Sequence, residues 1–227
     1  MANTRVSRKS LKEPDEFISF SSKLLRQAVL HKTKMIAAIS VLLGILIIVS
    51  GFRYFSEKAE NKGSLMLNRA MDQYVSTNRE SGPEKAGEMV TVDFQKILND
   101  YSGRDCGKFA RLNFAGICYR SGNFDKAVTL YTQAIDDFKS VPLLRNIATC
   151  GLGYVYEEKK EYAKAAGLFE SLSVDPDLVM ADEVLFALGR LYGLMEKNDK
   201  RIQVLGKIAD KHPESMYKEL VRGAVAG

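Results

Sequence analysis

The sequence is poor in the side chains that most often carry catalysis, with no tryptophan, two histidines and three cysteines among 227 residues. Neither His31 nor His212 is surrounded by Cys, Asp or Glu at the spacing of a metal site or of a nucleophile with its base. The cysteines form no Cys-x-x-Cys motif. We therefore expect a protein that is not an enzyme and that holds no cofactor and no metal.

The three cysteines, Cys106, Cys118 and Cys150, lie in the part of the chain that we expect to be exported. An odd number permits one disulfide with one free thiol, or three buried thiols. We favour buried thiols, because Cys118 falls on an inward-facing helical position.

The charge is unevenly distributed along the chain. The net charge is +5 and the isoelectric point is near 9.0, values that are also seen in nucleic-acid-binding proteins. From residue 56 onward, however, 24 Lys or Arg face 25 Asp or Glu. The excess positive charge belongs to the N-terminal region, so we expect no nucleic-acid partner and interpret it as a signal of membrane topology.

Residues 35–52, MIAAISVLLGILIIVSGF, are eighteen residues without a charge. As a helix they would extend about 27 Å, enough to cross the hydrocarbon core of a bilayer. One alternative, a buried helix of the globular domain, is disfavoured because the run is apolar on every side. The other is a signal peptide cleaved near Val49-Ser50-Gly51. The 34 preceding residues and the long apolar core favour an uncleaved anchor at residues 35–55. No Cys stands directly after the run, which excludes a lipoprotein signal.

The flanking charges give the orientation of this anchor. Residues 1–34 contain eight Lys or Arg, against Arg53, Lys58 and Lys62 just beyond the run. The positive-inside rule places the N-terminus in the cytoplasm and the rest of the chain outside it, which in a bacterium is the periplasm. Within the tail, residues 14–30 have the pattern of an amphipathic helix, either a lead-in to the span or a docking helix for a cytoplasmic partner.

Downstream of the span the sequence repeats itself. GNFDKAVTLYTQAI at residues 122–135 is echoed by KEYAKAAGLFESL at residues 160–172. The overlay pairs Phe124 with Tyr162, Ala127 with Ala165 and Tyr131 with Phe169. This spacing puts an aromatic-Ala-aromatic stripe on one face of a helix. Matching apolar positions upstream indicate that each unit is a pair of helices, and a weaker third copy begins at Leu188-Gly189.

The pattern resembles the tetratricopeptide repeat (TPR), which has a Leu-Gly pair and a Tyr on its first helix and Ala, aromatic and Ala on its second. The resemblance implies an all-α fold: an α-solenoid of TPR-like helix hairpins preceded by a single transmembrane helix. We predict a cytoplasmic tail (1–34), an anchor (35–55), a linker with degenerate TPR-like helices (56–107), three TPR units (108–213) and a C-terminal capping helix (214–227). Within the linker region, residues 65–101 carry two apolar helical stripes, one with Tyr74 and the next with Phe94.

In such solenoids the first helices line a concave groove that binds proteins or extended peptides. Carried onto this sequence, the groove-facing positions include nine residues that we take as the partner-binding set: Leu112, Asn113, Tyr119, Arg120, Ile147, Tyr154, Glu157, Phe186 and Arg190. We expect Tyr154→Ala to weaken partner capture while leaving the fold nearly intact. The chain's own C-terminal end is an alternative occupant of the groove.

A single anchor, a basic cytoplasmic tail and an exported repeat domain together resemble the bacterial inner-membrane family that includes the ancillary subunit of the Sec translocon. The resemblance implies that the partners are exported proteins, the translocon or periplasmic chaperones. Two other classes of function remain open at this point: a self-associating scaffold of the envelope, for which Ser40 and Gly44 offer a small-residue pair in the span, and an enzyme or the essential subunit of one.

Overall fold

A computed structural model describes residues 29, 31–176 and 178–225, and every regular element in that part of the chain is a helix. Apart from residue 29, the amphipathic helix predicted at residues 14–30 lies outside the described residues. The chain divides into two compact units, Met1–Glu57 and Lys58–Gly227.

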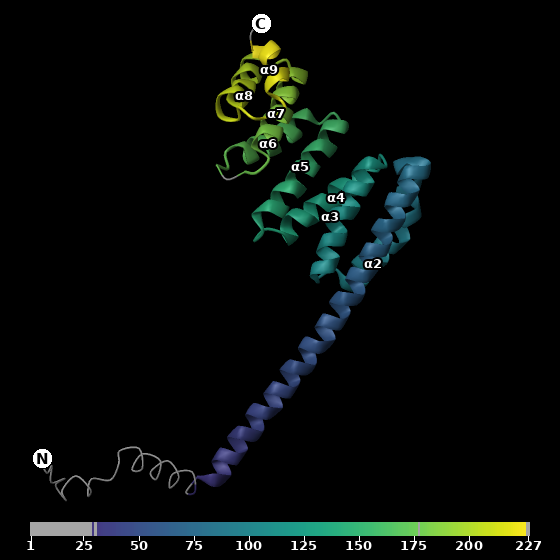
Figure 1. Cartoon of the computed structure of the whole chain (residues 1–227), viewed down its shortest axis with the longest axis vertical. Helices are drawn as coiled ribbons and strands as arrows, with labels where there is room; N and C mark the ends of the chain where they lie inside the picture. Colours follow the sequence, from purple (N-terminus) through teal and green to yellow (C-terminus); the bar gives the residue numbers. More distant parts are fainter. Residues whose placement is uncertain (1–28, 30, 177, 226–227) are drawn as a thin grey trace, which may run out of the picture. The chain divides into compact units, whose positions relative to one another are not determined.

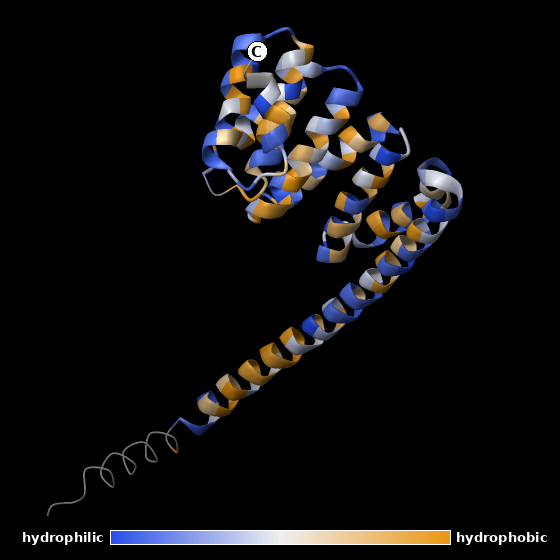
Figure 2. Ribbon diagram, turned by 45° about the horizontal axis from the view of Figure 1, so that its top comes forward, coloured by the Kyte–Doolittle hydropathy of each residue, from blue (hydrophilic) through white to orange (hydrophobic). Residues whose placement is uncertain are grey.

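In the first unit, the apolar run forms the early part of helix α2, which extends over Lys32–Tyr101. Its large side chains, such as Ile36, Leu46 and Phe52, are exposed at 63%, 52% and 75%. Figure 2 shows that this stretch is largely hydrophobic, whereas the part of the helix that follows it is largely hydrophilic. Among the described residues this is the one helix whose length and composition would let it cross a membrane.

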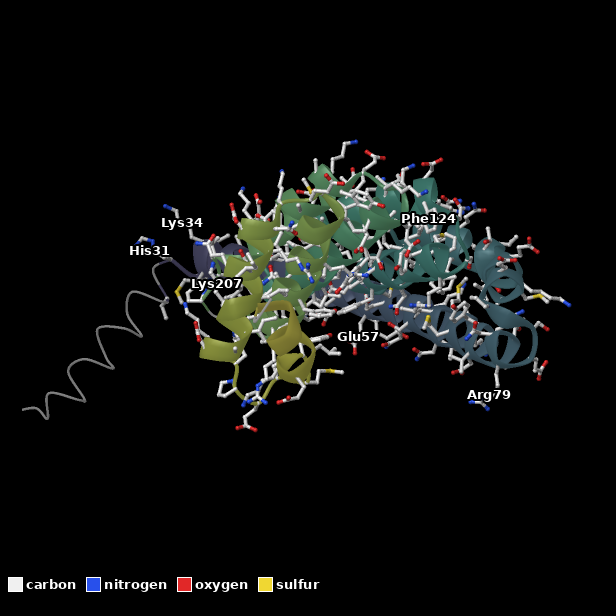
Figure 3. The ribbon with its side chains drawn as sticks, turned by 90° about the horizontal axis from the view of Figure 1, so that it is seen from above. His31, Lys34, Glu57, Arg79, Phe124 and Lys207 are labelled. Atoms are coloured by element: carbon white, nitrogen blue, oxygen red, sulfur yellow. The ribbon has the colours of Figure 1, made fainter. Side chains whose placement is uncertain are left out.

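The second unit begins with the remainder of α2, which folds back on itself at Gly82. This glycine has φ 84° and ψ 171°, a left-handed conformation that a side chain disfavours, and Pro83 starts the returning arm. Arg79, just before the turn, points away from the molecule (Figure 3). Tyr74 on one arm and Phe94 on the other are buried, so the apolar stripes predicted at residues 65–101 face the core.

The rest of the unit is a succession of helix pairs closed by a short helix (Figure 1). The pairs are α3 (Asp105–Arg120) with α4 (Phe124–Asp137), α5 (Pro142–Glu158) with α6 (Tyr162–Ser173), and α7 (Ala181–Leu194) with α8 (Asn198–Lys211); α9 (Lys218–Val225) follows. The prediction of an all-helical, TPR-like solenoid is therefore confirmed. The final helix begins at Lys218 rather than near residue 214, because turns occupy the positions before Lys218.

The turn inside each pair has the same geometry. Gly122, Lys160 and Glu196 all adopt left-handed conformations, with φ of 75°, 59° and 59°. The next residue in each turn donates its N–H to the carbonyl five residues earlier over 2.8 Å: Asn123 to Cys118, Glu161 to Tyr156 and Lys197 to Tyr192. This is the hydrogen bond of a Schellman motif, which ends a helix by satisfying one of its last carbonyls.

Two of these turns carry a side chain where glycine is favoured. Lys160→Gly and Glu196→Gly are each expected to raise the free energy of unfolding by about 0.5 kcal/mol, because a Cβ disfavours the left-handed conformation. Gly122→Ala is the reciprocal control and should lower it. Urea unfolding followed by circular dichroism measures all three. A loss of stability in both glycine variants would contradict this account of the turns.

Small residues allow the helices within the solenoid to approach closely. Ala127 and Ala165, the paired positions of the repeat, are both fully buried. A Cβ added to Gly151 would lie 2.3 Å from the ring of Tyr131, and one added to Gly189 would lie 2.3 Å from Leu205. Large side chains from the second helices thus fill the space that glycines on the first helices leave open.

The three cysteines are buried free thiols, as predicted. Burial raises the pKa of the Cys106 and Cys118 thiols to about 11 and that of Cys150 to about 12. We therefore expect no modification of the folded full chain by a water-soluble maleimide, since the reactive species is an accessible thiolate. Mass spectrometry should count three adducts after denaturation, and rapid labelling of the native protein would show that a thiol is exposed.

Candidate functional site

The first-helix residues chosen from the sequence differ in how open they are. On α3, Leu112 and Tyr119 are half-buried and Arg120 is exposed. The side-chain amide of Asn113 donates to the carbonyl of Phe109 on its own helix over 2.8 Å. Asn113 therefore already has a local acceptor for its amide hydrogens.

Arg120 is held in place by the preceding hairpin. Its Nε donates to the Tyr74 hydroxyl over 3.0 Å, and its guanidinium carbon lies 5.3 Å from the centre of the same ring. The sequence pattern had placed Tyr74 on an apolar helix stripe and had not connected it with Arg120. The structure thus adds Tyr74 to the site as a positioning residue.

The α5 positions are partly closed. Ile147 is 38% exposed, but Cys150 is buried at 5%, with its sulfur 3.4 Å from that of Met180. Although Cys150 occupies a position that often lines the groove, its thiol is inaccessible here. Open apolar surface on α5 is therefore provided by Ile147 rather than by Cys150.

Tyr154 belongs as much to the core as to the groove. Its ring lies 5.2 Å from that of Phe169, and its hydroxyl donates to a carboxylate oxygen of Glu183 over 2.8 Å. Burial, and the hydrogen bond to Glu183 after it, raise the pKa of Tyr154. The expectation that Tyr154→Ala leaves the fold nearly intact is wrong for this geometry, because the change would open a cavity beside Phe169 and remove a donor from Glu183.

An ion pair connects the second helix pair (α5 with α6) to the third (α7 with α8) across this face. Arg190 on α7 donates to the Glu157 carboxylate on α5 over 2.9 Å, and the Glu157 side chain is 11% exposed. Tyr119 on α3 lies within electrostatic range, since its pKa is raised first by burial and then by the charges of Glu158 and Glu157. Three of the predicted residues therefore form one polar strip across α3, α5 and α7.

Burial raises the pKa of Glu157, and the charge of Arg190 offsets this only in part. A carboxyl whose pKa is higher in the folded than in the unfolded state stabilises the fold fully at low pH and loses that contribution as pH rises through the folded pKa. We expect the unfolding free energy of the wild type, relative to Glu157→Gln, to fall as the pH rises above about 4, the ordinary range of a glutamate pKa. Urea unfolding at several pH values tests this, and an increase with pH would contradict it.

The chain's own C-terminal segment covers the α7 end of the face. Phe186 stacks on Tyr217 with ring centres 4.4 Å apart, and the Ser215 hydroxyl donates to Asp182 over 2.7 Å. The predicted partner-binding residue Phe186 is therefore covered by the chain's own Tyr217. Its neighbour Arg190 remains exposed.

The described residues contain no group of three or more His, Cys, Asp or Glu side chains that could hold a metal ion. On the first-helix face, the groups with a shifted pKa are the half-buried Tyr119 and Tyr154, the buried Cys150 thiol and the paired Glu157 carboxyl. Apolar and aromatic surface next to a polar strip can bind a peptide or a helix.

Residues 31–175, more than half of the sequence, match the family called tetratricopeptide repeat-like domain. The chain belongs to this family. Such domains generally act in interactions between proteins, so the first-helix face of this TPR-like protein is its candidate binding surface. No curated protein matches the chain.

Two solved structures have the same fold at low sequence identity. A tetratricopeptide repeat protein from Parabacteroides merdae has a TM-score of 0.55 and 16% identity, and the match covers 71% of this chain and 59% of that one. A putative kinesin light chain from Podosopora anserina, with nearly identical TPR-like repeats, has a TM-score of 0.57 and 15% identity over 72% of this chain and 85% of its own. These similarities concern the fold alone.

Proposed function

We propose that this TPR-like protein is a protein-binding module tethered to the bacterial inner membrane. One observation carries the proposal: an uncharged run of eighteen residues with exposed side chains, in a chain whose later part is a TPR-like solenoid. Exposed side chains such as Ile47 and Ile48, each 72% exposed, need an apolar environment to cover them. A lipid bilayer meets that need for a helix of this length.

The proposed topology rests on the flanking charges. Eight Lys or Arg precede the run within residues 1–34, and the solenoid side has only Arg53, Lys58 and Lys62 nearby. This asymmetry favours a cytoplasmic N-terminus and a periplasmic solenoid. Fusions of residues 1–60 and of the full chain to a periplasm-active phosphatase test the topology, and phosphatase that is active only when fused to the N-terminus would overturn it.

The proposed partners are exported proteins, components of the Sec translocon or periplasmic chaperones. Support comes from the architecture, which resembles that of the family containing the ancillary translocon subunit, and from the open part of the first-helix face. Ile147 offers apolar surface there, and Glu158 adds an exposed charge. The combination suits an extended chain with apolar side chains and few fixed polar contacts.

Photo-crosslinking in native membranes tests the binding role. A photo-reactive amino acid placed at Ile147 or Glu158 should capture exported chains or translocon subunits. The matched control is Gln133, which is exposed on the second helix α4 and should give few adducts. Equal adducts from all three positions, or none from Ile147 and Glu158, would count against the module.

A self-associating scaffold is the second candidate function. The observation in its favour is the spacing of Ser40 and Gly44, which puts two small residues on one side of the apolar helix. Adducts exclusively to a second copy of the chain, together with a mass that rises with protein concentration, would favour this role. Ser40→Leu should then lower the dimer fraction.

A further inference from the structure

The C-terminal segment that covers Phe186 is incompletely packed. Val221 is buried at 1%, but Leu220 is 65% and Met216 is 80% exposed. A cavity of about 410 Å³ remains among α7, α8 and α9, with Phe186 and Leu220 in its lining. Part of the segment's surface beside this open cavity therefore lacks packing partners.

Two arginines line this cavity. Arg190 and Gly193 are three residues apart on α7 and so lie on one face of that helix. A Cβ on Gly193 would lie 3.4 Å from Cδ and 3.6 Å from Nε of Arg201, which places the Arg201 side chain against this face. Gly193 thus leaves room for the long cationic side chain of Arg201. Arg201 itself stands at a position where the repeat pattern has alanine.

The positive charge of the cavity is incompletely neutralised. Arg190 is paired with Glu157 on its outer side, whereas no carboxylate within residues 29, 31–176 and 178–225 forms an ion pair with Arg201. No acidic residue in this described part of the chain lines the cavity. A ligand that fits well would therefore bring a carboxylate to it.

The C-terminal segment that already lies at this site, from Ser215 to α9, indicates the shape of such a ligand. Tyr217 stacks on Phe186, and Val221, four residues on, is buried and donates its N–H to the Tyr217 carbonyl over 3.0 Å. An aromatic residue followed by an apolar one at the fourth position is the face of one helical turn. Leu220, at the third position, lines the cavity with the arginines.

We propose that the α7 end of the groove binds a short helix of a partner protein that carries an aromatic residue, an acidic residue three positions later and an apolar residue at the fourth. The segment from Ser215 to α9 is the resident competitor, which mimics the aromatic and the apolar residue but has Leu220 in place of the acid. This inference rests on the proposed binding function and names the chemistry of one part of its site.

The acidic position is tested within the full chain. Leu220→Glu should slow amide hydrogen exchange of residues 219–222 by about threefold, because its carboxylate would reach Arg201. Leu220→Gln, of the same shape without charge, should not. Arg201→Ala should remove the gain, whereas Lys207→Ala, on the same helix but exposed, should keep it (Figure 3). Equal effects of Glu and Gln would overturn the charge recognition.

Binding in trans is tested with a fluorescein-labelled synthetic peptide of residues 213–227 that contains the Leu220→Glu change. Tyr217→Ala in the full chain removes the resident stack on Phe186, and we expect it to tighten peptide binding by about tenfold. Adding Arg201→Ala should cancel most of that gain. The proposal would be contradicted if the peptide did not bind the Tyr217→Ala chain, or if adding Arg201→Ala left the peptide affinity unchanged.

The two proposals fail separately. Crosslinks from Ile147 to exported chains without peptide binding would leave the membrane-tethered module standing and remove this helix site. Peptide binding without crosslinks from Ile147 or Glu158 would leave the helix site and count against the proposed partners.

Discussion

The Ala165→Arg variant is expected to lose about 3 kcal/mol or more of unfolding free energy. Ala165 is fully buried in α6, at the repeat position that it shares with Ala127 of α4. An arginine there would bring a long charged side chain into space that the core residues Phe169 and Leu188 already fill. Either the helices separate or the guanidinium is buried without a partner.

Urea unfolding of the full chain in detergent measures the loss. The matched control is Ala163→Arg, two residues earlier on the same helix at an exposed position, which should change stability little. The transition of Ala165→Arg should remain cooperative, since α6 packs against both α5 and α7. Similar losses in both variants would show that the buried face of α6 has been assigned incorrectly.

Asp137→Ala is expected to cost about 2 kcal/mol, because it leaves a largely buried guanidinium without its carboxylate. Arg111 on α3 forms an ion pair with Asp137 on α4, and their side chains are 11% and 20% exposed. Burial lowers the pKa of Arg111, so its charge is already disfavoured there. Its Nε is one of two buried side-chain polar atoms without a hydrogen-bond partner among the described residues.

A double replacement separates the pair from its surroundings. Arg111→Met with Asp137→Leu should recover most of the lost stability, because both buried charges are removed together. Asp136→Ala is the control: its partner Lys139 and Asp136 itself are exposed, and such pairs contribute little. A double variant as unstable as Asp137→Ala would mean that packing, rather than charge, determines the effect.

The helical repeat was predictable because its signal is local. Residues three and four apart share a helix face, so the spacing of Phe124, Ala127 and Tyr131 was enough to indicate an amphipathic helix and the face it buries. The same local logic indicated the hairpin at residues 65–101 from its two apolar stripes. Its turn at Gly82 requires a left-handed conformation that glycine favours.

The binding face was only partly predictable. Repeat positions placed Ile147, Tyr154 and Phe186 on first helices, but the pattern could not say which of them neighbouring elements cover. Glu183 accepts a hydrogen bond from the hydroxyl of Tyr154, twenty-nine residues earlier, and Tyr217 covers Phe186. Both residues lie too far along the chain for helical spacing to relate them to the groove.

The sequence by itself determined the period of the helices, the position of the uncharged run and the segregation of positive charge, because each depends on residues that are close along the chain. The tertiary structure alone decided that Arg120 rests on Tyr74, forty-six residues earlier, and that Arg111 pairs with Asp137. It also decided that the C-terminal segment occupies the end of the groove. Such contacts depend on how successive helix pairs stack, and stacking is set by the fit of many side chains at once rather than by any local pattern.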